Sequence, residues 1–117
     1  MTKYSTIFQK FLNLTQAVDN LAEFSELTAD ELHLIKCLNS FWVNKENITV
    51  VNAMNLENNM STSTTFRILK KLRQKGFIKL TIDKADSRIK YVNPTDKIQS
   101  LFHQYGKILM KVANDEI

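Results

Sequence analysis

The sequence has few of the residues that end helices and form turns. It contains 2 glycines and 1 proline in 117 residues. A chain with so few helix-breaking residues favours long helices over many short strands. The length suffices for one hydrophobic core. We therefore expect residues 1–117 to form a single domain.

Long apolar runs are also absent. No segment approaches the roughly 20 apolar residues that a membrane-spanning helix needs, and residues 1–4 lack the charged-then-apolar order of a secretion signal. The one cysteine, Cys37, has no second cysteine for an internal disulfide, which favours a reducing compartment. We therefore expect a cytoplasmic protein.

Residues for catalysis or metal binding are equally scarce. Gly76 and Gly106 are the only glycines, so the sequence has no glycine-rich phosphate-binding loop. His33 and His103 stand apart from each other and lack the spacing of zinc ligands. Because no nucleophile has a neighbouring base, we expect no enzymatic activity, no metal and no cofactor.

Two further features have both a structural and a functional interpretation. Cys37 lies in a helical segment among apolar residues, so we interpret it as a buried structural residue in preference to a redox switch. Phe41, Trp42 and Tyr105 could line an effector pocket, but aromatic residues at helical spacing are more often core. The sequence identifies no small-molecule effector.

Charge is unevenly distributed along the chain. Residues 1–60 carry 4 Lys and Arg against 7 Asp and Glu, whereas residues 61–117 carry 12 against 5. Within residues 61–90 the count is 9 against 2, although the whole chain has a net charge of only +4. Such a basic segment is typical of a surface that meets phosphates, and a merely solvated basic face is the alternative.

Apolar spacing and capping residues predict four helices before residue 76. The predicted helices cover residues 4–24, about 28–42, about 50–58 and 61–75. Thr28 begins a capping box, and Thr49 and Ser61 are suitable N-caps. The pair Asn58-Asn59 is typical of a turn, and Gly76 is the expected C-terminal stop of the fourth helix.

The period then changes from helical to alternating. We expect strands over residues 77–82 and 88–92, with a polar hairpin tip over 83–87. Pro94 suits the start of a last amphipathic helix, residues 96–113. The order α-α-α-α-β-β-α predicts a mainly α protein with a small antiparallel β-hairpin, which is a winged helix-turn-helix.

The fourth predicted helix has an apolar side and a polar side. Phe66, Leu69 and Leu72 share one side, which we expect to dock into the core. At the start of the helix, free backbone N–H groups near Ser61 and Thr62 are suited to a phosphate. The residues that we expect to contact DNA from this helix are Ser61, Thr62, Ser63, Thr64, Arg67, Lys70, Lys71 and Gln74.

Within this set the roles differ with position along the helix. We expect Arg67, Ser63 and Thr64 to reach base edges, because the N-terminal part of such a helix normally enters the major groove. Lys70 and Lys71 lie further along and suit backbone phosphates. A solvated helix face is the alternative interpretation.

The predicted wing, residues 82–90, is also basic and is expected to meet the minor groove or the DNA backbone. Lys84, Arg88 and Lys90 would project from it, and a long arginine there can enter a narrow minor groove. Asp86 could orient the Arg88 guanidinium or close the turn. A plain salt bridge that holds the hairpin is the alternative interpretation.

Six short segments occur in an order that is typical of one protein family. They are Leu27–Glu31, Ser61–Leu72, Lys75–Ile78, Asp86–Arg88, Tyr91–Val92 and Pro94–Thr95. Over roughly residues 27–96 the chain resembles the MarR family of winged-helix transcriptional regulators. The resemblance implies a homodimer whose first and last helices, 4–24 and 96–113, intertwine, with Asp86 and Arg88 as the wing motif.

Three features depart from the family pattern. The helix-turn-helix turn, Leu56–Met60, lacks the usual glycine, Pro94-Thr95 replaces the usual Leu-Thr after the wing, and the last helix is short. We therefore expect a divergent member of the family.

The function that we expect is a homodimeric transcriptional regulator of double-stranded DNA, by analogy with the family a repressor. One alternative is a replication or partition protein of a mobile element, which would select direct repeats instead of inverted ones. Another is a winged-helix protein-interaction module, which would not bind a duplex even at about 50 mM salt.

Overall fold

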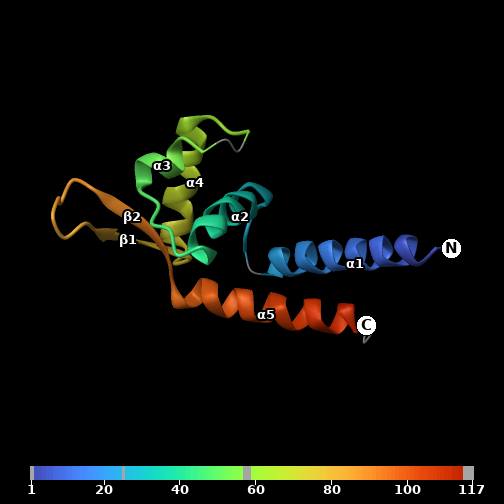
Figure 1. Ribbon diagram of the computed structural model, residues 1–117. Helices are drawn as coiled ribbons and strands as arrows, with labels where there is room; N and C mark the ends of the chain where they lie inside the picture. The colour runs from blue at the N-terminus through green and yellow to red at the C-terminus, as the bar shows by residue number, and fades with distance from the viewer. Residues whose placement is uncertain (1, 25, 57–58, 115–117) are drawn as a thin grey trace. The chain divides into compact units, whose positions relative to one another are not determined.

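The computed structural model describes residues 2–24, 26–56 and 59–114 (Figure 1). Its helices and strands follow the predicted order, so the winged helix-turn-helix fold is confirmed. The elements are α1 Lys3–Phe24, α2 Ala29–Val43, α3 Val50–Met54, α4 Thr62–Gln74, β1 Ile78–Ile82, β2 Lys90–Pro94 and α5 Asp96–Ala113. The chain divides into a central unit, residues 29–99, and a terminal unit, residues 1–28 and 100–117. The single domain stays a prediction.

Hydroxyl caps fix the starts of the two helices of the helix-turn-helix. Thr49 caps α3 by accepting the N–H of Asn52, and Ser61 caps α4 by accepting the N–H of Thr64. At the other end of α4, Gly76 has a φ of 82°, a left-handed conformation that costs glycine little. These three sequence predictions are confirmed.

Helix α3 is shorter than predicted. It ends at Met54 instead of residue 58, because Asn55 leaves the helical conformation and donates its N–H to the carbonyl of Asn52. Of the predicted Asn58-Asn59 turn, residue 58 lies outside the described residues. Asn59 has a φ of 64°, so asparagine supplies the left-handed residue where the family usually has glycine.

The two strands form an antiparallel hairpin in which Leu80 is opposite Val92 and Ile78 is opposite Pro94. The prediction of the second strand was wrong by two residues, because β2 begins at Lys90 and Arg88 lies in the turn. Pro94 ends β2 and does not start α5. A proline fits the end of this strand because it has no N–H to pair.

The core of the central unit lies between α2, α4 and the hairpin. Its buried apolar residues are Leu32, Leu34, Ile35, Leu38, Ile48, Ala53, Ile68, Leu69, Leu72, Phe77, Ile78, Val92 and Ile98. Trp42 at the end of α2 is half-buried, and its indole N–H donates to the carbonyl of Val92 at 3.0 Å. This bond ties α2 to β2 and thereby fixes the hairpin on the helices.

The terminal unit exposes much of its apolar surface. Large apolar side chains of α1 that are mostly exposed are Tyr4, Ile7, Phe8, Phe11 and Leu12. On α5, Leu109 and Met110 are also exposed. The first part of the apolar stripe predicted for residues 4–24 is therefore exposed within one chain, from Tyr4 to Leu12.

Candidate nucleic-acid interface

Helix α4 buries one side and exposes the other. Thr65, Ile68, Leu69 and Leu72 are buried in the central unit. The exposed residues of α4 are Thr62, Ser63, Phe66, Arg67, Lys70, Lys71, Arg73 and Gln74. Its sequence, TSTTFRILKKLRQ, contains four basic residues and no acidic one. The exposed side of α4 is therefore strongly positive.

The residues of this helix that we predicted to contact DNA all reach the surface. Thr64 is half-buried, and the other seven are exposed. Burial of Arg67 or Lys71 would have contradicted the hypothesis, and both side chains are exposed. Of the three side chains that we expected to read bases, Arg67 and Ser63 are exposed and Thr64 is half-buried.

The first turn of α4 is held by its own hydroxyl groups. The Ser61 hydroxyl accepts the Thr64 N–H at 3.1 Å and donates to the Thr64 Oγ1 at 2.8 Å. Thr65 donates its hydroxyl to the carbonyl of Ser61 at 3.0 Å. The first turn of the helix is thus capped by side-chain hydrogen bonds, and the helix dipole leaves partial positive charge there.

The C-terminal end of α4 is anchored by two lysines. Lys75 Nζ lies 2.7 Å from Oε1 of Glu31, whose side chain is 1% exposed. Lys97 donates to the backbone carbonyl of Lys75 at 2.6 Å, and its Nζ lies 4.4 Å from the centre of the Phe77 ring. No local pattern predicts this ion pair, because it joins residues that are 44 positions apart in the sequence.

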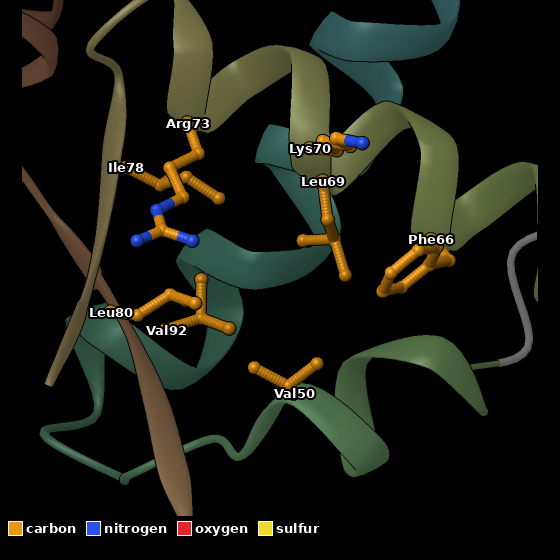
Figure 2. Close-up of a pocket in the computed structure, with 8 residues that line it drawn as sticks. All are labelled: Val50, Phe66, Leu69, Lys70, Arg73, Ile78, Leu80 and Val92. Carbon is orange, nitrogen blue, oxygen red and sulfur yellow. The ribbon is translucent and has the colours of Figure 1, made fainter. Parts of the chain in front are cut away.

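Phe66 corrects one sequence prediction. We expected it in the core with Leu69 and Leu72, but its side chain is 50% exposed whereas theirs are buried. Its ring closes one end of a cavity of about 180 Å³ between α3, α4 and the hairpin (Figure 2). The lining residues are Val50, Phe66, Leu69, Lys70, Arg73, Ile78, Leu80 and Val92.

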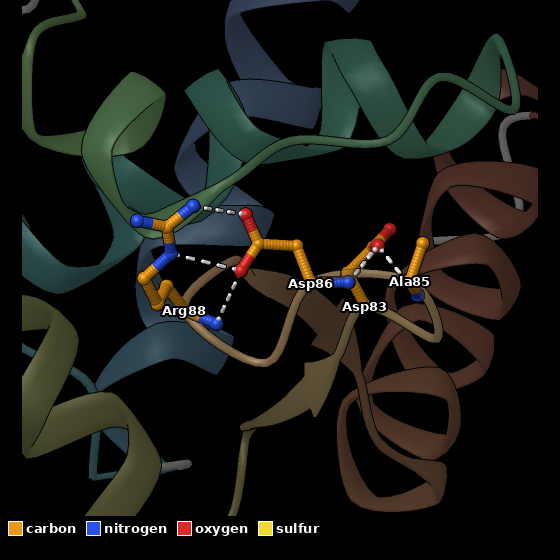
Figure 3. A network of polar contacts seen from close by, with 4 residues as sticks. All are labelled: Asp83, Ala85, Asp86 and Arg88. Atoms are coloured by element: carbon orange, nitrogen blue, oxygen red, sulfur yellow. Dashed lines mark hydrogen bonds and ion pairs between the residues drawn. The ribbon is translucent and has the colours of Figure 1, made fainter.

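In the hairpin loop, Asp86 holds the Arg88 side chain in place (Figure 3). Asp86 Oδ1 accepts the backbone N–H and the Nε–H of Arg88, and its Oδ2 accepts from Nη2, each at 3.0 Å. These bonds, first that of the side chain and then that of the backbone, lower the pKa of Asp86 below 3.8. The Arg88 side chain is 88% exposed, so the guanidinium is oriented yet accessible.

A second carboxylate, Asp83, shapes the same loop and was missed by the sequence analysis. Its Oδ2 accepts the backbone N–H groups of Ala85 and Asp86 at 3.0 Å (Figure 3), and its Oδ1 accepts the Tyr91 hydroxyl at 2.6 Å. The bond from Tyr91 is the main reason that the pKa of Asp83 falls below 3.8. An Asp at the end of an expected strand is the sequence signal for such a turn.

The remaining predicted residues of the hairpin are also accessible. Lys84 and Lys90 are exposed on either side of the Asp86–Arg88 pair. Asp86 is half-buried and directed at Arg88, so its charge is partly neutralised there. The loop therefore presents cationic groups beside two half-buried carboxylates, Asp83 and Asp86, that are both held by hydrogen bonds.

Other chemistry has less structural support. Cys37 is half-buried, so the expectation of a buried cysteine is wrong, and its Sγ lies 3.9 Å from Nε2 of His33 one turn away. Among residues 2–24, 26–56 and 59–114, no group of three or more His, Cys, Asp or Glu side chains is placed to hold a metal ion. None of the helices in the described part of the chain is long and apolar enough to cross a membrane.

Comparison with known proteins supports the fold through structure alone. No protein-family model and no curated protein sequence matches the chain. Several solved structures do match over almost its whole length.

One of these structures is the F27L mutant of S. aureus MepR bound to an oligodeoxyribonucleotide. It has a TM-score of 0.72 and 19% identity and covers 98% of this chain and 82% of MepR. A second structure is that of MepR, a transcription regulator of the Staphylococcus aureus multidrug efflux pump MepA. It has a TM-score of 0.65 and 16% identity, and the match covers 98% of this chain and 82% of MepR.

A third structure is the heme sensor PefR from Streptococcus agalactiae in complex with heme. Its TM-score is 0.54 and its identity is 20%, over 97% of this chain and 80% of PefR. The neighbours are MarR-type regulators, and the fold of this chain is MarR-like. At these identities the likeness establishes the fold.

Proposed function

We propose that this protein is a transcriptional regulator that binds double-stranded DNA sequence-specifically and is a divergent member of the MarR family. The observation that carries the proposal is the exposed side of α4, which is basic and free of acidic residues. A helix of this kind fits the major groove, where phosphates flank the base edges. The MepR mutant with a similar fold was bound to an oligodeoxyribonucleotide, which supports the same ligand here.

Each part of α4 has a role in this proposal. Arg67, Ser63 and Thr64 read base edges, with Arg67 suited to the O6 and N7 atoms of guanine. Lys70 and Lys71 contact phosphates. Ser61, the N-cap, and Thr62 contact a DNA phosphate at the start of α4, and Gln74 contacts DNA near its end.

The hairpin loop provides the second contact. Arg88 is presented by the bidentate Asp86 carboxylate, and an oriented guanidinium loses less freedom when it enters a minor groove. Lys84 and Lys90 flank the Asp86–Arg88 pair in the sequence and contact phosphates of the DNA backbone. In this proposal the Asp86–Arg88 pair both holds the hairpin and positions the arginine.

We further propose that the protein acts as a homodimer and represses transcription in the cytoplasm without enzymatic activity, metal or cofactor. The uncovered apolar side of α1 is what a second copy would bury, and α5 contributes exposed apolar residues as well. A dimer places two copies of α4 on half-sites about one helical turn apart. Repression follows from occupancy of such a site.

Selection of bound sequences from random duplex DNA, combined with the solution mass, tests this proposal. We expect an inverted repeat and the mass of a dimer. Direct repeats would instead indicate a replication or partition protein. If no duplex is retained at about 50 mM salt, where phosphate contacts are strongest, the proposal is wrong and a protein-interaction module is favoured.

A further inference from the structure

Phe66 stands out on the surface of α4. All residues of this helix are described, and Phe66 is the one apolar residue among its exposed positions. The others are hydroxyl, amide or cationic side chains. Its position therefore places an aromatic ring where the positively charged side of α4 borders the buried side, about 60° around the helix from Leu69.

Around the helix axis Phe66 neighbours Ser63, which we assign to base reading, and Lys70, which we assign to phosphates, whereas Arg67 is about 100° away. At about 100° per residue, Phe66 is roughly 60° around the helix from Ser63 and roughly 40° from Lys70. Phe66 is the fifth residue of α4, within the N-terminal half that normally reaches base edges. An apolar group at this point meets the floor of a major groove.

The surroundings of Phe66 are apolar at the centre and cationic at the edge. Figure 2 shows the ring at one end of the cavity with Val50 and Leu69 on its inner side, while Lys70 borders the cavity beside Leu69 and Arg73 lies at the opposite end. DNA offers the complementary pattern, because the methyl group on C5 of thymine projects into the major groove between two rows of phosphates.

We infer that Phe66 is a specificity-determining residue that contacts the C5-methyl group of a thymine in each half-site. The contact covers part of the exposed ring, while Lys70 and Arg73 remain free to meet phosphates. This inference rests on the proposed function and adds to it one base preference that Arg67 does not explain. An apolar contact distinguishes thymine from the other bases through the methyl group alone.

Replacement of thymine by uracil tests the inference, because it removes only that methyl group. In the selected duplex, each thymine of a half-site is replaced singly by deoxyuridine, and binding is measured by fluorescence anisotropy. For the unaltered protein we expect one position where uracil weakens binding about three- to five-fold, as burial of one methyl group predicts. For Phe66→Ala we expect equal binding of the thymine and uracil duplexes at that position.

Two variants serve as controls. Phe66→Leu keeps an apolar side chain and should retain part of the thymine preference. Val51→Ala removes another exposed apolar residue, which lies on α3 and does not line the cavity, and should leave the preference unchanged. Far-UV circular dichroism confirms that each variant is folded, as expected for changes at half-exposed or exposed positions.

The outcomes separate this inference from the proposed function. If the protein selects a specific site but no thymine-to-uracil replacement weakens binding, or if Phe66→Ala keeps the full preference, the inference is overturned and the DNA-binding function stands. If no specific duplex is bound at all, the proposed function fails and the inference fails with it.

Discussion

At the scale of the residue, Gly76 holds a left-handed conformation, φ 82°, directly after Lys75, the C-cap of α4. A β-carbon there would meet only the Lys97 side chain at 3.7 Å, an ordinary contact, so the cost of Gly76→Ala arises from the backbone. We expect the free energy of unfolding to fall by about 1–2 kcal/mol in urea denaturation.

Gly106→Ala is the matched control for this prediction. Gly106 lies inside α5 without positive φ, and a β-carbon added to it would meet no atom of the described residues within 4 Å. Alanine should therefore raise the free energy of unfolding by roughly 0.5–1 kcal/mol. Equal effects of the two substitutions would contradict the account of how α4 ends.

The hairpin loop gives a residue-scale prediction about pH. The Tyr91 hydroxyl is the largest cause of the lowered pKa of Asp83, whereas Arg88 is that of Asp86. Tyr91→Phe should therefore raise the titration midpoint of Asp83 toward 3.8 and leave that of Asp86 low, as measured by NMR of the carboxyl carbons.

The sign of the effect on stability follows from the lowered pKa values. Since both carboxylates titrate below 3.8 in the folded protein, their contribution is present above pH 3.8 and is lost as pH falls through the folded pKa values. We expect the loop to keep its geometry from about pH 5 to 8. A change between pH 5 and 8 in the NMR signals of the hairpin loop, residues 83–89, would contradict the assignment of lowered pKa values to Asp83 and Asp86.

The sequence predicted local features of single residues correctly but not their burial. Ser61, Thr49 and Gly76 were predicted correctly, because caps and stops depend on neighbours within four residues. Phe66 was assigned to the core from helical spacing, but spacing gives only an angle around the helix and not what lies opposite. Cys37 was expected to be buried because its neighbours in the sequence are apolar, but adjacent residues of a helix face different sides, and Cys37 is half-buried.

At the scale of the element, α4 is fixed to α2 by the Glu31–Lys75 pair. Lys75→Met removes the cation from a carboxylate that is 1% exposed, while the Lys75 side chain is itself 29% exposed. We expect the free energy of unfolding to fall by about 1–3 kcal/mol. This loss is smaller than that for a fully buried pair, because the Lys75 side chain is partly exposed. Lys36→Met, an exposed position on α2, is the control and should change stability little.

Elements were predicted better than their ends. The helices and strands occur in the predicted order because apolar periodicity is a local property of the sequence. The predicted start of β2, residue 88, was wrong because the Asp86 carboxylate binds Arg88 and keeps it in the turn. Contacts such as Glu31–Lys75 and Trp42–Val92 span 44 and 50 residues and leave no local pattern.

At the scale of the whole molecule, the exposed apolar side of α1 predicts self-association. Phe8→Glu places a charge among apolar residues that a second copy would bury, so we expect the solution mass to shift from dimer toward monomer. Asn13→Glu introduces the same charge on roughly the opposite side of α1 and should leave the mass unchanged. Analytical ultracentrifugation measures both, and an unaltered dimer in Phe8→Glu would contradict this interface.

If the exposed side of α4 reads duplex DNA, variants of that side must differ in their affinity for a selected site and for a scrambled site. Arg67→Ala should weaken binding of the selected site by about 1–3 kcal/mol and scarcely affect the scrambled one. Lys71→Ala should weaken both alike and reduce the slope of log affinity against log salt by about one. If both variants bind the selected site as tightly as the parent protein does, α4 does not read DNA and the account is wrong.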